Sequence, residues 1–177
     1  YDVVVKEPGG DRVMNIGPVR GILASDRGQV AREVSECAIA AVSVGQKGLP
    51  QIVPQIAEGL KWRKEKYGLY PLDIILAENL RGAARYTAGL LKENLPEDFP
   101  VEEMTGLIET SIGKMVPIMP RAIQQADPLL VYAEAYNTLI LDRRGFRNPI
   151  PEVEGLAPKD HIQAWVDRKS YIHNFGH

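Results

Sequence analysis

The chain has 177 residues, of which 45% are hydrophobic and 25% charged, a composition typical of a folded globular protein. Its net charge of −2 and the lack of a dense Lys/Arg run argue against a nucleic-acid or membrane-surface partner. One cysteine, Cys37, excludes an internal disulfide and favours a reducing compartment such as the cytoplasm, and no stretch of sequence is long and apolar enough to span a bilayer.

The beginning of the chain predicts short strands and a helix. Val-rich residues 1–6 predict a strand, residues 12–25 predict one or two short strands broken by glycine and proline, and residues 26–34 predict a helix. The chain starts without Met or a signal-peptide pattern and stops within a polar cluster. We therefore expect it to be a piece of a longer protein.

Residues 37–95 predict the order strand, helix, strand, helix. The strands are the short apolar runs 37–45 and 73–77, and the helices are the periodic segments 49–68 and 81–95. In the first of these helices, the run "KWRKEK" alternates charges and predicts a solvated face. This order is typical of a parallel α/β sheet, in which ligands bind beyond the C-terminal ends of the strands.

The pattern changes after "NLPEDFP", so we place a domain boundary near residue 95 and divide the chain into residues 1–95 and 96–177. Beyond it we expect a helix over 101–110, strand-like residues within 127–142, a polar loop over 143–158, and a last helix from His161 that Asp160 caps.

Two predicted strand ends carry candidate site residues. Val44 and Gly45 could bring backbone close to a cofactor, or could simply end a strand. Glu78 and Asn79 place a carboxylate and an amide where sites form, although Asn79 could instead cap the next helix. A G-x-G-x-x-G phosphate loop is missing from the sequence, so a loop of that kind would have to precede Tyr1.

The C-terminal segment "HIQAWVDRKSYIHNFGH" crowds polar groups onto a half-apolar stretch. On a helix, Lys169, Asn174 and His177 fall on one broad face. A partly desolvated lysine suits a general base, and an asparagine N–H can stabilise a developing alkoxide. An ordinary surface helix with solvated Lys and His is the alternative.

The last eleven residues, "DRKSYIHNFGH", resemble the catalytic helix of the polyol-specific long-chain dehydrogenases, with the pattern Lys-x-x-x-x-Asn-x-x-His. Collinear stretches also resemble this family: "AVSVG", "LDIILAENLRGA", "ADPLLVYAEAYNTLILD" and "IPEVEGLAPKDHIQAWVDRK". The short spacing between these blocks and the Glu-Asn pair favour the mannitol-1-phosphate branch. One departure is the segment 112–114, Ile-Gly-Lys, where the family usually shows Val-Asp-Arg.

The resemblance implies part of a Rossmann-type NAD-binding domain, followed by the start of a mostly helical substrate domain. It implies a metal-independent oxidoreductase that interconverts a polyol or its phosphate with the keto form, acting as a monomer or weak oligomer. The resemblance implies that Lys169 is the general base, that Asn79 and Asn174 hold the oxyanion, and that His177 is a positioning group. It implies that the cofactor is contacted by Val44, Gly45, Glu78 and Asn79. It also implies that the substrate is bound by Lys114 together with Lys169, Asn174 and His177.

The departure at 112–114 leaves the substrate open: mannitol 1-phosphate and fructose 6-phosphate are expected, and a hexuronate or an unphosphorylated polyol is the alternative. A non-catalytic ligand-binding relative is a further alternative, because the phosphate loop is missing. We expect the 177 residues alone to be inactive.

Overall fold

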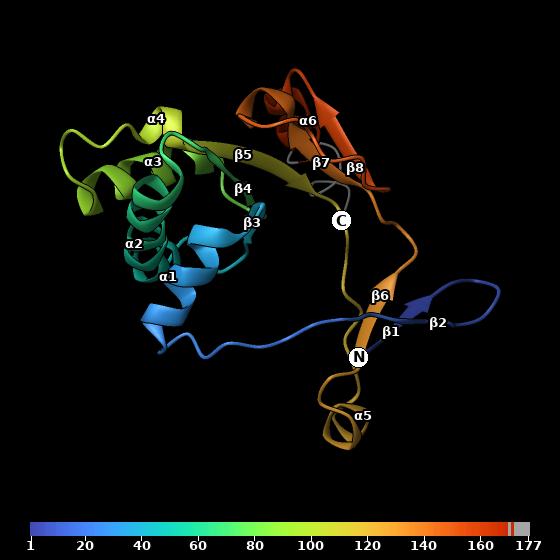
Figure 1. Ribbon diagram of the computed structural model, residues 1–177. Coiled ribbons are helices and arrows are strands. Elements are labelled where there is room, and N and C mark those ends of the chain that lie inside the picture. Colours follow the sequence, from blue (N-terminus) through green and yellow to red (C-terminus); the bar gives the residue numbers. More distant parts are fainter. Residues whose placement is uncertain (170, 172–177) are drawn as a thin grey trace. The chain divides into compact units, whose positions relative to one another are not determined.

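A computed structural model describes residues 1–169 and residue 171 of the chain (Figure 1). The chain divides into two compact units, one formed by residues 1–21 and 113–138 and the other by residues 22–112 and 139–177. Each unit is treated by itself below. None of the helices in the described part of the chain combines the length and the apolar character that a membrane crossing requires.

The smaller unit contains a sheet whose described strands run in the order β2-β1-β6. Its elements are β1 (Asp2–Lys6), β2 (Arg12–Asn15), α5 (Arg121–Ala126) and β6 (Val131–Glu134). Strand β1 pairs antiparallel with β2 and parallel with β6. The predicted first strand is confirmed, and of residues 12–25 only β2 is extended into a strand.

The larger unit contains the α/β part of the chain. Its elements are α1 (Arg27–Glu36), β3 (Ile39–Val42), α2 (Leu49–Tyr67), β4 (Leu72–Leu76), α3 (Ala83–Asn94), α4 (Val101–Met104), β5 (Thr105–Ile112), β7 (Leu139–Asp142), η1 (Arg143–Gly145), β8 (Leu156–Lys159) and α6 (Ile162–Arg168). The described strands form one sheet in the order β3-β4-β5-β7-β8. Strands β3, β4 and β5 are parallel, β7 runs antiparallel to β5, and β8 is parallel to β7.

Local sequence signals explain where two of the helices begin and end. The Asp26 side chain caps α1 by accepting a hydrogen bond from the backbone N–H of Gln29 at 3.1 Å. Helix α2 ends at Gly68, whose φ of 70° is costly for a residue with a side chain. Both helices lie where the sequence predicted them.

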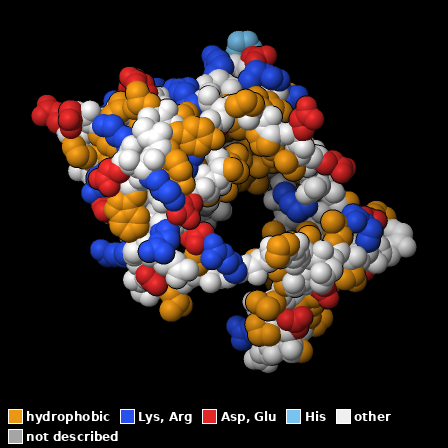
Figure 2. Space-filling model, in the orientation of Figure 1, with side chains coloured by type: hydrophobic (Ala, Val, Ile, Leu, Met, Phe, Trp, Pro, Cys, Tyr) orange, Lys and Arg blue, Asp and Glu red, His pale blue; other side chains and the backbone are white. Residues whose placement is uncertain are grey.

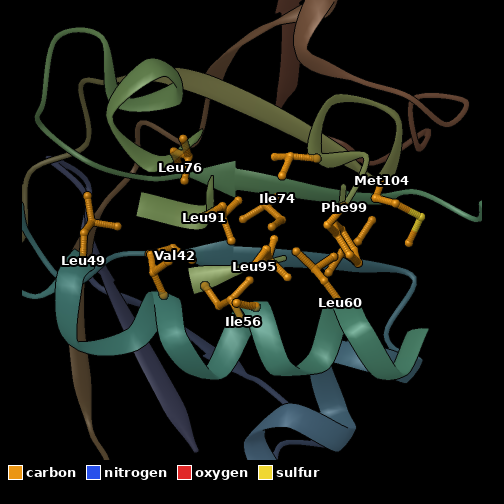
Figure 3. Close-up of a cluster of buried hydrophobic side chains, with 14 of the residues drawn as sticks. Val42, Leu49, Ile56, Leu60, Ile74, Leu76, Leu91, Leu95, Phe99 and Met104 are labelled. Carbon is orange, nitrogen blue, oxygen red and sulfur yellow. The ribbon is translucent and has the colours of Figure 1, made fainter. Parts of the chain in front are cut away.

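The core of the larger unit lies between α2 and the parallel strands. The apolar stripe of α2 includes Leu49, Ile56 and Leu60, and Figure 3 shows these side chains pointing toward Ile74 and Leu76 of β4. Every residue of β4 is buried, as expected for a central parallel strand covered on both faces. Each fully buried Leu or Ile of this kind contributes roughly 1.5–3 kcal/mol of hydrophobic stabilisation, so this layer fixes the strand ends that follow it.

The predicted helix over 101–110 is wrong beyond its first turn. Only α4 is helical, and β5 follows it directly. Residues Thr105, Ile108, Thr110 and Ile112 are β-branched, and they favour a strand that pairs with β4 and β7. The α/β sheet therefore continues past residue 95, and one of its pairings is antiparallel, which the sequence did not indicate.

Two further expectations are corrected in the segment that leads to α6. Part of the predicted loop over 143–158 forms η1 and the beginning of β8. Asp160 does not cap α6, because His161 occupies the N-cap position. The Asp160 carboxylate instead forms an ion pair with the Arg143 guanidinium at 3.1 Å.

Arg63 corrects the prediction that "KWRKEK" forms a solvated helix face, because its side chain is 2% exposed. Its guanidinium donates to the backbone oxygens of Ser35 (3.0 Å), Cys37 (2.9 Å), Tyr70 (2.9 Å) and Pro71 (3.3 Å). It therefore ties the end of α1 to the chain that enters β4. On the face of the molecule shown in Figure 2, acidic and basic side chains are interspersed.

Candidate active site

The candidate site lies where β3 and β4 end. These strands are parallel and in register, with Val42 opposite Leu76, so their C-terminal ends meet at one edge of the sheet. Beyond them the chain carries Val44 and Gly45 on one side and Glu78 on the other. The sequence predicted these positions as candidate site residues, and the topology brings them together.

The Glu78 carboxylate joins the two strand ends. It is 6% exposed, and its oxygens accept hydrogen bonds from the backbone N–H groups of Val44 at 2.7 Å and Gly45 at 2.9 Å. Gly45 has a φ of 74°, and a Cβ built on it would meet no atom within 4 Å. The Glu78 carboxylate thus fixes the backbone of the turn. At Gly45 the turn borders open space, which a flat ring could approach.

Asn79 contacts the predicted general base. Its Oδ1 accepts a hydrogen bond from the Nζ of Lys169 at 3.1 Å. Asn79 does not cap the following helix, because the N-cap of α3 is Gly82. The structure therefore brings together the amide and the ammonium that the sequence assigned to one site.

Helix α6 is anchored to the rest of the site by two contacts. Arg81, in the loop between β4 and α3, forms an ion pair with Asp167 of α6. Ser111 of β5 donates its hydroxyl to the backbone oxygen of Trp165 at 3.4 Å. Both contacts lie in the last turns before Lys169, which follows the last residue of α6, so they help to hold its side chain against the end of β4.

A cavity of about 270 Å³ opens at this position. Its lining comes from the ends of β4 and β5 and from α6: the residues used below are Glu78, Asn79, Thr110, Ser111, Val166 and Lys169. The polar groups converge from three elements, the usual arrangement of a binding site in an open α/β sheet. A larger cavity of about 540 Å³, lined by residues of 92–103, contains none of the predicted site residues.

Three predicted site residues fall outside the described part of the larger unit. Lys114 lies in the smaller unit, where its ammonium donates to the backbone oxygens of Glu134 (3.0 Å) and Tyr136 (2.7 Å). Asn174 and His177 lie outside the described residues. Within the described part of the chain, His, Cys, Asp and Glu side chains form no group of three or more that could hold a metal ion.

Sequence reasoning missed the contribution of β5 to the site. Thr110 and Ser111 line the cavity, and Thr110 also donates its hydroxyl to the backbone oxygen of Leu76 at 2.9 Å. Thr110 is the last residue of the predicted helix over 101–110, and Ser111 directly follows it. The β-branched residues between Thr105 and Ile112 were the signal that could have placed them on a strand beside β4.

Parallel strands, connecting helices and convergent polar groups at the strand ends define the class: the larger unit is a Rossmann-type α/β domain, which confirms the predicted fold. Residues 1–155 match the family described as "Mannitol dehydrogenase Rossmann domain". The chain belongs to this family, so the resemblance found in the sequence is confirmed. The position of the boundary to a substrate domain stays a prediction.

The fold is also similar to that of a solved enzyme, the Pseudomonas fluorescens mannitol 2-dehydrogenase in a ternary complex with NAD and D-mannitol. The TM-score is 0.74 at 14% sequence identity, and the match covers 96% of this chain and 43% of that enzyme. This chain thus spans less than half of the length of the enzyme that it matches.

Proposed function

We propose that the full-length protein is an NAD-dependent, metal-independent polyol dehydrogenase of a reducing, cytoplasmic compartment. The hydrogen bond from Lys169 to Asn79 carries this proposal, because it sets a proton-transfer group against an amide at the edge where ligands of such sheets bind. Family membership and the NAD complex of the solved relative support the cofactor.

NAD would be held at the Val44–Gly45 turn, where the open space around Gly45 suits a flat ring. The bound cofactor would supply the hydride acceptor. Lys169 takes the proton of the substrate hydroxyl, while the carbon that bears this hydroxyl loses a hydride to the cofactor. A C–H bond and an O–H bond break, and a C=O bond forms. Asn79, together with Asn174, holds the oxygen as its negative charge develops. In the reverse direction, Lys169 returns the proton to the carbonyl oxygen.

The proposed substrate is mannitol 1-phosphate, with fructose 6-phosphate as the keto product. Its support is the short spacing of the family blocks and the Glu-Asn pair after β4. Unphosphorylated mannitol is the second candidate, favoured by the D-mannitol complex of the solved relative and by the altered 112–114 segment. A comparison of kcat/KM for the two polyols, with a hexuronate as a third substrate, decides between these candidates.

The catalytic assignment is tested with Lys169→Ala in the full-length protein. Loss of the general base should lower kcat by about 10²- to 10⁴-fold, while the Kd for NADH changes by less than about twofold. Lys159→Ala is the matched control, because its ammonium lies 5.2 Å from the Trp165 ring and it does not line the cavity. A Lys169→Ala enzyme with near wild-type turnover would favour a non-catalytic ligand-binding relative or another base.

A further inference from the structure

Glu78 is a buried carboxylate for which the proposed hydride transfer has no direct use. It transfers no proton in the mechanism above. Each of its oxygens accepts one hydrogen bond from the backbone, at 2.7 Å from Val44 and 2.9 Å from Gly45. Hydrogen bonds to a charged acceptor are roughly twice as strong as neutral ones, so this side chain has strong control over the orientation of both peptide groups.

These two peptide groups form the turn that leaves β3. The carbonyl oxygen of Gly45 then accepts from the backbone N–H groups of Gly48 (2.9 Å) and Leu49 (3.2 Å), so the turn is continuous with the first residues of α2. A Cβ on Gly48 would come within 2.6 Å of the Val44 carbonyl oxygen, which shows how closely the turn is folded. With the N–H groups directed at Glu78, the open side at Gly45 is left for a ligand.

Glu78 is also the immediate neighbour of Asn79, whose Oδ1 accepts from Lys169. A shift of the Glu78 backbone therefore moves the amide that contacts the proposed base. The dipeptide connects two features that lie on different strands, namely the turn after β3 and the side-chain pair at the end of β4. The turn and the side-chain pair must both be correctly positioned for a hydride to pass between cofactor and substrate.

We infer that Glu78 is a positioning residue, which fixes the cofactor-facing turn at Val44 and Gly45 relative to the Asn79–Lys169 pair. This inference rests on the proposed function, because it assumes that NAD binds at that turn. In this role Glu78 affects cofactor binding indirectly, by fixing the backbone of the turn that the cofactor contacts.

The test is Glu78→Gln in the full-length protein, with the Kd for NADH measured by fluorescence titration. The amide oxygen of glutamine can replace one acceptor, but its NH2 group faces the second N–H and leaves it without a partner. We expect the Kd to rise by about tenfold or more. The same result is expected for Glu78→Asp, which keeps the charge but is too short to reach both N–H groups.

Glu109→Gln is the matched control, because the Glu109 carboxylate accepts one backbone N–H, that of Ala84 at 3.0 Å, and does not contact the turn. The amide oxygen of this variant can still accept that one N–H, so neither the thermal stability nor the Kd for NADH should change appreciably. Equal NADH affinity in both Glu78 variants and the wild type would overturn the inference, as would an equal loss of affinity in Glu109→Gln. Failure of the proposed function is separate, because it would appear as normal turnover in Lys169→Ala.

Discussion

The Nζ of Lys169 lies 3.1 Å from the Oδ1 of Asn79, although ninety positions of sequence separate the two residues. The contact joins the end of α6 to the end of β4, two elements that the fold brings together through the sheet order β4-β5-β7-β8. Neither residue alone indicates a catalytic site. Their proximity supports a catalytic role for both.

Replacement of Asn79 by alanine should slow the reaction without preventing cofactor binding. The variant loses the acceptor that holds Lys169 and a donor for the developing oxyanion, so we expect kcat to fall by roughly 10- to 10³-fold in the full-length protein. Steady-state kinetics at saturating NAD measures this, with NADH titration as the control. An unchanged kcat would remove Asn79 from the catalytic group.

Removal of metal ions should leave the activity intact. The proposed proton transfer uses the side chain of Lys169, and the oxygen of the substrate is held by amides. Full-length enzyme dialysed against EDTA should therefore retain its kcat, and added Zn²⁺ or Mg²⁺ should not increase it. A loss of activity that a single metal ion restores would contradict the proposed mechanism.

Asp73 should be one of the most sensitive positions for stability. It is 2% exposed, and its carboxylate accepts from the backbone N–H of Arg147 (2.8 Å) and from the backbone and side chain of Asn148 (each 3.1 Å). Asp73→Ala removes the acceptor of the two partly buried backbone N–H groups, whereas the Asn148 side chain keeps its hydrogen bond to the Pro71 carbonyl oxygen. The free energy of unfolding should fall by about 3 kcal/mol. Urea denaturation measures the change.

Asp98→Ala provides the comparison for this experiment, because Asp98 lies in an exposed turn. A surface substitution of this kind should change the free energy of unfolding by less than about 0.5 kcal/mol. Equal effects of the two substitutions would mean that the Asp73 hydrogen bonds are not important for stability.

The thiol of Cys37 should react slowly in the native protein. Desolvation by burial raises the pKa of Cys37, and the nearby Arg63 guanidinium opposes the shift only in part. Because the raised pKa favours the thiol over the reactive thiolate, alkylation by iodoacetamide at neutral pH should be slower than in urea, and should accelerate as the pH rises toward the pKa. Rapid native-state labelling at neutral pH would show that the thiol is accessible and ionised.

Much of the fold of the larger unit follows from local sequence. The helical period of α2 and the apolar run of β4 are strong signals, and both elements lie where they were predicted. The segment around Thr105 was misassigned because its first residues form a true helical turn, and the following β-branched residues become a strand only by pairing with β4 and β7. That pairing is tertiary, and a local pattern does not contain it.

The candidate site divides in the same way. Polar residues after a buried strand identified Glu78 and Asn79, but not what their side chains contact. The hydrogen bonds from the Val44 turn to Glu78 depend on the register of β3 against β4. Arg63 illustrates the same limit, because a charged stretch on a helix indicates solvent unless its carbonyl partners, contributed by other elements, are known.

The parallel pairing of β1 with β6 affects how the protein can be made. Val3 lies opposite Val131, so β1 leaves the ribosome well before β6, the strand that pairs with one of its edges, has been synthesised. At roughly 5–20 residues per second, that delay is on the order of ten seconds. During this time the described strand available to pair with β1 is β2. A two-stranded hairpin is at best marginally stable in water, so a chaperone that binds extended apolar segments would find its target there.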